Sequence, residues 1–179
     1  MPSLLASPFA PVVQLIQAQL VAKTGVPVQA VKVIARDSSF VPHFQGDRDL
    51  LLRFSGPQPQ GGFLHGSGRV ASILERHLQV TCRVRLNADP SDDDLRSLID
   101  PNYGLYLLEE AVIDALWGFW PTDAQGNTLT VTVIQWVASP PEQKQLAVPP
   151  PLDWVEGHLA FLIPYQANLP SGPLYPQLS

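Results

Sequence analysis

The chain has 179 residues, of which 45% are hydrophobic and 15% are charged. This balance predicts one folded domain with a buried core and argues against a wholly disordered protein. The net charge is −5 and there is no large cluster of lysine and arginine. The chain therefore lacks the positive surface that binding to duplex nucleic acid requires. Cys82 is the only cysteine, which excludes an internal disulfide.

The start of the chain and its prolines indicate how the chain is divided. Residues 1–20 carry no basic segment ahead of the apolar ones, and no stretch approaches the ~18 uninterrupted apolar residues of a membrane-spanning helix. We therefore expect neither a signal peptide nor contact with a membrane. The 19 prolines concentrate at the N-terminus, in residues 139–151 and after Asn168. We expect a single domain over residues 1–166 and a proline-rich C-terminal tail over residues 167–179.

The N-terminal part predicts one helix and two strands. Pro8 or Pro11 suits the first turn of a helix that ends at Gly25, and its apolar residues recur at helical spacing: Val12, Val13, Ile16 and Leu20. Two stretches of β-prone residues follow, at residues 31–36 and 48–54, and both are predicted to be strands.

A glycine- and proline-rich stretch, residues 56–68, predicts a mobile loop ahead of the clearest pattern in the sequence. In residues 74–86 apolar and polar residues alternate, and only Arg76 breaks the phase. The apolar members are Leu74, Leu78, Val80, Cys82, Val84 and Leu86. This period of two predicts a long strand with one buried face, which is typical of antiparallel sheets because parallel sheets are covered on both sides.

The second predicted helix has clear signals at both ends. Asp100 suits the N-cap and Pro101 the first helical position, and Pro121 ends the helical pattern. The apolar residues between them follow at steps of three and four: Leu105, Leu108, Val112, Leu116 and Phe119. We predict an amphipathic helix that packs one face against the core.

Two more strands are predicted after this helix. Threonine and apolar residues alternate from Thr128 onward, and the apolar register slips at Ile134, which predicts a β-bulge. A second alternation covers residues 155–165, and because Pro164 cannot donate a backbone hydrogen bond, this strand or its end is expected at a sheet edge. The order of elements predicts an α+β fold, with an antiparallel β-sheet of about four to five strands and two α-helices packed on one face.

Histidine and cysteine give no pattern that predicts a metal, cofactor or catalytic site. The histidines share no zinc-type spacing: His43, His65, His77 and His158. His77 and His158 lie on polar faces of predicted strands and could meet if those strands pair, although ordinary surface histidines are the commoner explanation. Cys82 belongs to the apolar phase of its strand and is expected to be buried and inert.

The carboxylates and the glycine-rich segment also give no pattern that predicts a functional site. Asp92, Asp93 and Asp94 are expected in a solvated turn, because the loop lacks the spaced ligands of a calcium-binding loop. Glu109 and Glu110 are expected on the solvated face of the second helix. The glycines of residues 61–68 lack the lysine of a phosphate-binding loop. We therefore predict no catalytic residue, no metal ligand and no cofactor, and expect that the protein is not an enzyme.

Five segments stand out in combination. They are RHLQVTCRVRL, the acidic break NADPSDDD, the helical stretch LYLLEEAVIDALWGF, and the strand patterns LTVTVIQWV and WVEGHLAFLIPYQ. Their order resembles the tail-terminator family of long-tailed bacteriophages, whose members follow a helix, a meander, a second helix and a returning pair of strands. The resemblance covers residues 12–165. The loop at residues 56–68 and the stretch at residues 139–153 are longer and richer in proline than a minimal member needs.

The resemblance implies a structural virion protein. Members of this family form a ring of six subunits that terminates the tail tube at its head-proximal end and joins it to the head connector. The implied partners are other copies of the chain, the tail tube protein, a sheath where the tail has one, and the head-tail connector or stopper. DNA would pass through the lumen without specific binding. The implied location is the tail or neck of the virion, after assembly in the host cytoplasm.

Two alternatives stay open from the sequence. One is another neck protein of similar fold, such as a stopper or a connector, and the other is a small-molecule-binding module. For assembly we expect contacts from exposed aromatic and charged groups next to the edge strand: Arg83, Arg85 and Trp154. The C-terminal tail is expected to be a contact arm that becomes ordered on assembly.

Overall fold

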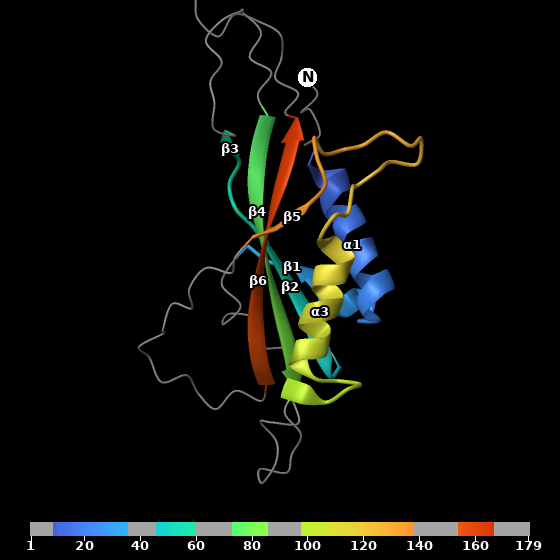
Figure 1. Cartoon of the computed structure of the whole chain (residues 1–179), viewed down its shortest axis with the longest axis vertical. Coiled ribbons are helices and arrows are strands. Elements are labelled where there is room, and N and C mark those ends of the chain that lie inside the picture. The colour runs from blue at the N-terminus through green and yellow to red at the C-terminus, as the bar shows by residue number, and fades with distance from the viewer. Residues whose placement is uncertain (1–8, 36–45, 60–72, 86–97, 138–153, 167–179) are drawn as a thin grey trace, which may run out of the picture.

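The computed structural model describes residues 9–35, 46–59, 73–85, 98–137 and 154–166 (Figure 1). The helices are α1 (Ala10–Thr24) and α3 (Leu105–Leu116), and the strands are β1 (Val31–Val33), β2 (Arg48–Phe54), β3 (Gln58–Pro59), β4 (Ile73–Arg85), β5 (Gln135–Val137) and β6 (Trp154–Gln166). The sheet has the order β1-β2-β4-β6-β5, and the short β3 pairs with β4 off this path. Neither described helix is long and apolar enough to cross a membrane.

Several predictions fall on segments outside the described residues. They concern His43, His65, the acidic turn with Asp92, Asp93 and Asp94, most of the loop at residues 56–68, the stretch at residues 139–153, and the C-terminal tail. The described residues do not test these predictions.

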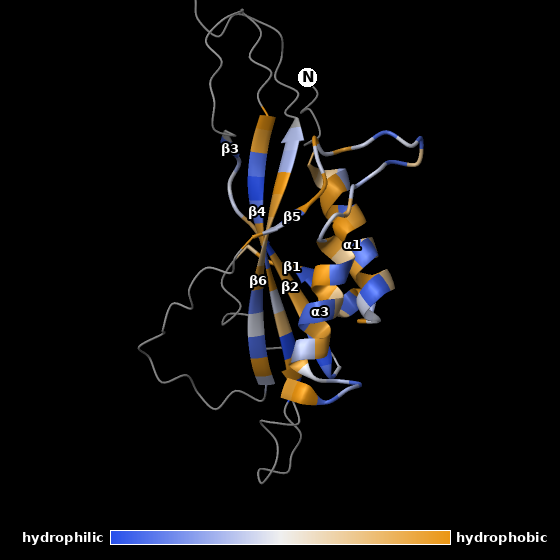
Figure 2. Ribbon diagram, in the orientation of Figure 1, coloured by the Kyte–Doolittle hydropathy of each residue, from blue (hydrophilic) through white to orange (hydrophobic). Residues whose placement is uncertain are grey.

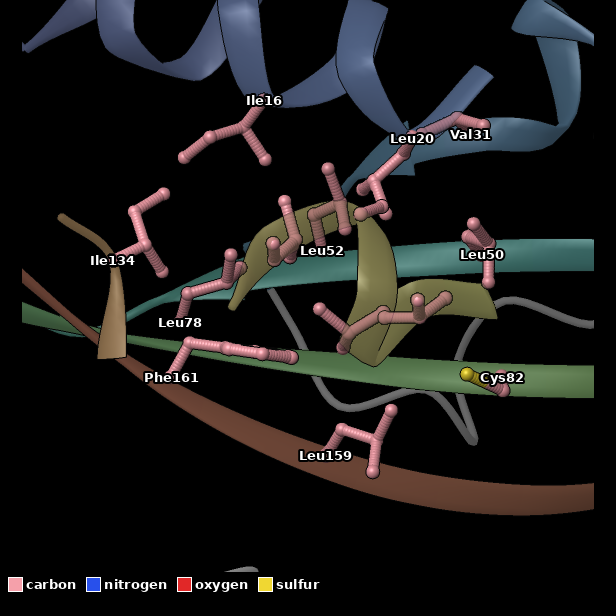
Figure 3. Close-up of a cluster of buried hydrophobic side chains, with 14 of the residues drawn as sticks. Ile16, Leu20, Val31, Leu50, Leu52, Leu78, Cys82, Ile134, Leu159 and Phe161 are labelled. Atoms are coloured by element: carbon pink, nitrogen blue, oxygen red, sulfur yellow. The ribbon is translucent and has the colours of Figure 1, made fainter. Parts of the chain in front are cut away.

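The α+β class is confirmed, and both helices lie on the same face of the sheet (Figure 1). Side chains from the helices and from that face of the strands form one core (Figure 3), where Ile16 and Leu20 of α1 meet the sheet residues Leu52 and Phe161. Hydrophobic and hydrophilic residues succeed one another along the long strands (Figure 2), as expected for a sheet with two different faces.

One feature of the sheet differs from the prediction. β1 pairs with β2 in parallel, with Val31 opposite Leu50, so the sheet is mixed and not wholly antiparallel. Residues 34–47 connect the two strands, which is long enough for the crossover that a parallel pair requires. The antiparallel prediction came from the long alternating strand, β4, whereas β1 has only three residues and is too short to show such a pattern.

The first helix follows its prediction. α1 begins at Ala10 with Pro11 in its first turn and ends at Thr24. Gly25 follows with φ +69°, a left-handed conformation that glycine adopts without strain, and its N–H donates to the carbonyl of Val21 at 3.2 Å. The helix buries Val12, Ile16, Leu20 and Thr24.

Arg76 interrupts the apolar phase of β4 because it caps one end of the core. Its guanidinium donates to the carbonyl of Ser55 at 2.7 Å and to the Tyr165 hydroxyl at 3.3 Å. It also lies over the Phe9 ring, 4.9 Å from the ring centroid. The aliphatic stem can pack against the core while the charged head keeps polar and aromatic partners.

The second helix begins later than predicted. Asp100 does not cap α3: its Oδ1 accepts from the N–H of Asn102 at 2.7 Å and of Tyr103 at 3.0 Å, which closes a turn before the helix. Gly104 then has an extended conformation, with φ −60° and ψ 152°, so α3 begins only at Leu105. A Cβ at Gly104 would lie 2.7 Å from the carbonyl oxygen of Leu98, so the tight turn requires glycine.

The strand predicted from Thr128 onward is wrong for most of its length. β5 covers only Gln135–Val137. Before it, the chain folds back on its neighbours: the N–H of Leu129 donates to the carbonyl of Pro121 at 2.8 Å, and that of Val131 to Pro164 at 2.9 Å. The alternation of threonine and apolar residues is present, but single hydrogen bonds to Pro121 and to Pro164 of β6 take the place of a strand ladder.

Pro164 lies in a strand that is central for part of its length. β6 pairs with β4 along all of its residues and with β5 only at residues 160–162. Pro164 is beyond that pairing, and its carbonyl accepts the N–H of Val131 on the side away from β4. The end of β6 is therefore at the margin of the ladder, as the missing N–H of Pro164 requires.

Candidate functional site

Arg83 is buried, and this contradicts the expectation that it is an exposed contact. It lies on the face of the sheet opposite the helices, directly across from Asp49 of β2. Its Nε donates to Asp49 Oδ1 at 2.7 Å and its Nη2 donates to Asp49 Oδ2, so the ion pair is bidentate. Both side chains are 0% exposed. A buried ion pair is stable only when its hydrogen-bond geometry is good, because both charged groups have lost their hydration. The pair ties β2 to β4.

The other two expected contacts lie beside this ion pair. Trp154 is half-buried, and the guanidinium carbon of Arg83 lies 4.8 Å from the centroid of its ring. The indole N–H of Trp154 donates to Glu156 Oε2 at 3.3 Å. Arg85 is exposed and lies directly opposite Trp154 in the ladder. The structure therefore brings all three residues together at one end of β4 and β6, with only Arg85 open to solvent.

His158 extends this polar group along β6. Its Nδ1 shares a hydrogen bond with Thr81 Oγ1 at 3.1 Å, and its Nε2 lies 3.5 Å from Glu156 Oε1. The hydrogen bond from His158 holds the pKa of Glu156 below its usual value, against the opposing effect of burial. We call the six connected residues the far-face network: Asp49, Thr81, Arg83, Trp154, Glu156 and His158.

The arrangement of the far-face network is that of a structural group. Thr81, His158 and Glu156 follow one another like a hydroxyl, a base and an acid, but Thr81 is only 4% exposed, in the middle of a strand. His77 lies opposite Leu162 and not His158, so the two histidines do not meet. Among the described residues no group of three or more histidine, cysteine, aspartate and glutamate side chains could hold a metal ion. The network joins β2, β4 and β6 on the face that the helices leave uncovered.

Two residues of the helix-facing side belong to the same part of the sheet. Cys82 is buried as expected, and burial, with the charges of Glu109 and Asp49, raises the pKa of its thiol. Glu109 is half-buried, so its predicted place on a solvated helix face is wrong, whereas Glu110 is exposed as expected. A Cβ at Gly157 would overlap the Glu109 carboxylate. The absence of a side chain at Gly157 thus makes room for Glu109, and burial raises the pKa of that carboxyl.

A second group of residues has the opposite character. Three tryptophans near the end of α3 and on β5 are exposed: Trp117 (64%), Trp120 (46%) and Trp136 (44%). The rings of Trp117 and Trp136 lie 6.1 Å apart between centroids, tilted by 58°. The indole N–H of Trp120 donates to the carbonyl of Thr130 at 3.1 Å. We call these three residues the tryptophan surface.

The tryptophan surface includes an open edge of the sheet. Ile134 exchanges hydrogen bonds with the segment after α3, donating to the carbonyl of Phe119 at 2.8 Å and accepting from the N–H of Gly118 at 3.0 Å. Adjacent residues of a strand direct their backbone groups to opposite sides, so residues two apart direct them to the same side. Trp136, two residues further on, therefore directs its N–H and C=O away from β6. β5 is the last strand of the sheet, so these groups lie at its edge.

Only part of this site could be predicted from the amino-acid pattern. Tryptophans are common both in cores and in interfaces, and their spacing in the chain does not distinguish the two. The exposure of Trp117 follows from the position at which α3 ends, at Leu116, and that of Trp136 from the brevity of β5. Neither was evident from hydrophobic periodicity.

Comparison with models of known protein families gave no match, and comparison with curated proteins gave none.

Proposed function

We propose that this protein is a structural subunit of a bacteriophage tail, which forms a ring of six copies at the head-proximal end of the tail tube and joins the tube to the head connector. The resemblance of its sequence segments to tail terminators motivates the proposal. The observation that carries it is the tryptophan surface on the open edge of the sheet.

Exposed tryptophans at a sheet edge favour association with another protein. Tryptophan is among the residues that contribute most to binding energy at interfaces, and isolated proteins seldom leave contiguous aromatic groups in water. An edge strand also presents unpaired backbone groups that another chain can bind. Trp136 combines both properties, since the residue is 44% exposed and its backbone groups lie at the edge.

A ring needs two unlike surfaces on each subunit, because each copy meets its neighbours head to tail. The sheet has two unlike edges. β5 ends it on one side with the tryptophan surface, and β1, a three-residue strand, ends it on the other with Val33, which is 47% exposed. The two edges are separated by the width of the sheet, so they can contact different neighbours at the same time.

The other proposed partners are the tail tube protein, a sheath where one is present, and the connector or stopper at the head. The acidic composition suits this position: with a net charge of −5, the protein would not hold DNA that has to pass through the ring.

The test is the mass of the purified protein in solution over a concentration series, by light scattering, with negative-stain images of any large species. A species of six subunits with six-fold symmetry is expected. Because some ring subunits assemble only on their partner, the same measurement is repeated with tail tube protein present. A protein that stays monomeric in both samples contradicts the proposal.

A further inference from the structure

The C-terminal tail carries a pattern that matches the tryptophan surface. Its prolines, Pro170, Pro173 and Pro176, recur every three residues, and residues 167–179 contain no charged side chain. A polyproline II helix has three residues per turn and a rise of ~3.1 Å per residue. In that conformation the three prolines would share one face, ~9 Å apart.

Aromatic surfaces are the recognition sites of such segments. Proline-rich segments dock on grooves lined by aromatic rings, and they form few internal hydrogen bonds, so their carbonyl groups stay free to accept. Trp117 and Trp136 offer two rings 6.1 Å apart, both exposed. Proline rings pack on the faces of indole rings, and the indole N–H donates to carbonyl oxygens.

We propose that the tryptophan surface binds the C-terminal tail, residues 167–179, of a neighbouring copy of this chain. The inference rests on the proposed ring and names the segment by which one subunit holds the next. The lack of charge in the tail fits this surface, because a polar rim or a charged partner would be needed to hold a charged segment there.

The direction of β6 favours a neighbour's tail over the chain's own. Phe161 lies opposite Trp136, and β6 continues for five residues beyond it to Gln166, which carries the chain ~17 Å along the strand. The four residue steps from Gln166 to Pro170 reach at most ~14 Å even when fully extended, and the chain would first have to reverse. From its own β6 the chain cannot bring Pro170 to Trp136 and reaches it only with the later prolines after a reversal, whereas a second copy can bring any of the three prolines there.

Exchange of the tail would also explain how the open edge of the sheet is covered. The backbone N–H of Trp136 lies at this edge, where a carbonyl of the bound tail can accept it. Each copy would give one tail and receive another, so the contacts would close around a ring in the manner of an exchanged segment.

The experiment uses the full chain with a photo-crosslinking amino acid in place of Tyr175, between the second and third prolines. Copies grown with heavy and light nitrogen isotopes are mixed, allowed to assemble with tail tube protein present, and irradiated, and the crosslinked peptides are identified by mass spectrometry. The expected result is a crosslink from residue 175 to peptides containing Trp117 or Trp136, in which heavy and light chains are joined.

Two variants control this result. Pro170→Ser, Pro173→Ser and Pro176→Ser together, or Trp117→Ala with Trp136→Ala, should lower the crosslink yield about tenfold, as expected for the loss of one good contact worth ~1.4 kcal/mol. An unchanged yield in both variants, or crosslinks only within one chain, would overturn the proposal.

The mass of each sample separates this proposal from the ring itself. A ring of six copies without heavy-light crosslinks overturns the docking of the tail and leaves the ring standing. A sample that stays monomeric and gives no crosslink between chains contradicts both.

Discussion

The far-face network and the tryptophan surface use the same side chain in opposite ways. Trp154 is half-buried, with Arg83 over its ring and its indole N–H bonded to Glu156. Trp117 is 64% exposed and its ring contacts only another exposed tryptophan, Trp136, among the aromatic pairs of the described residues. The first tryptophan packs within the fold, whereas the second is the one that we propose contacts a neighbouring copy. Substitutions should therefore affect stability in the first region and assembly in the second.

The largest loss of stability is expected at the buried ion pair. Asp49→Ala removes the carboxylate that accepts two hydrogen bonds from the buried Arg83 guanidinium and should lower the free energy of unfolding by ~3–5 kcal/mol. Urea denaturation followed by circular dichroism measures this loss. The matched control is Asp114→Ala, which removes an exposed partner 3.6 Å from Lys23 and should change stability by less than ~1 kcal/mol.

Replacing both partners of the ion pair sharpens this result. Asp49→Leu together with Arg83→Met removes both charges and fills similar volume, so the double variant should be much closer to the wild type than Asp49→Ala is. A double variant as unstable as the single one would show that the far-face network acts through more than the pairing of these two charges.

A smaller loss is expected where the sheet meets α3. Gly157→Ala forces the Glu109 carboxylate to move and should lower the free energy of unfolding by ~1–3 kcal/mol. In the background of Glu109→Ala the overlapping group is gone, and the same substitution at Gly157 should be better tolerated. Thermal denaturation of the four proteins of this cycle tests the contact; equal losses in both backgrounds would refute it.

The indole N–H groups give a direct test of the two regions. Trp154→Phe removes the hydrogen bond to Glu156 while keeping an aromatic ring beneath Arg83, and should lower the free energy of unfolding by ~1 kcal/mol. Trp117→Phe should leave the stability of the subunit unchanged, because no described hydrogen bond is lost. If both variants lose the same stability in urea, the contrast between the regions is wrong.

The smallest effects concern pH, and they have opposite signs at two glutamates. The pKa of Glu109 is raised by burial, so its charge weakens the fold as the pH rises through that raised pKa, and Glu109→Gln should stabilise the protein near pH 7 but not near pH 3. The pKa of Glu156 is lowered, so its charge stabilises the fold above the ordinary pKa, and this contribution disappears as the pH falls through the lowered pKa.

Glu156→Gln should therefore destabilise the protein near pH 7 and have little effect at low pH. Thermal denaturation over a series of pH values measures both variants, and Glu110→Gln, at an exposed neighbouring position, serves as the control. Parallel pH profiles for Glu109→Gln and Glu156→Gln would contradict the assignment.

The sequence predicted the elements that rest on strong periodic patterns. The alternation around Cys82 located β4, and Pro11 with Gly25 located the ends of α1, because side-chain periodicity and backbone preferences act locally. The start of α3 was missed because it depends on the close packing of Gly104 against Leu98, a contact made only in the folded chain.

The burial of the far-face network and the exposure of the tryptophan surface could not be predicted from the sequence either, because both depend on contacts made only in the folded chain. Arg83 occupies a polar phase in its strand and was expected at the surface, but its burial depends on Asp49, which lies on another strand. Exposure of Trp117 and Trp136 likewise depends on where neighbouring elements end. Local patterns give the phase of a side chain, and tertiary neighbours decide whether that phase is covered.

If the tryptophan surface joins the subunits, Trp117→Ala/Trp136→Ala should stay monomeric under conditions where the wild type assembles. Native mass spectrometry should show six copies for the wild type and single folded copies for the variant, with the urea midpoint of the subunit unchanged. A variant that still forms the same six-copy species would show that the tryptophan surface does not join the subunits.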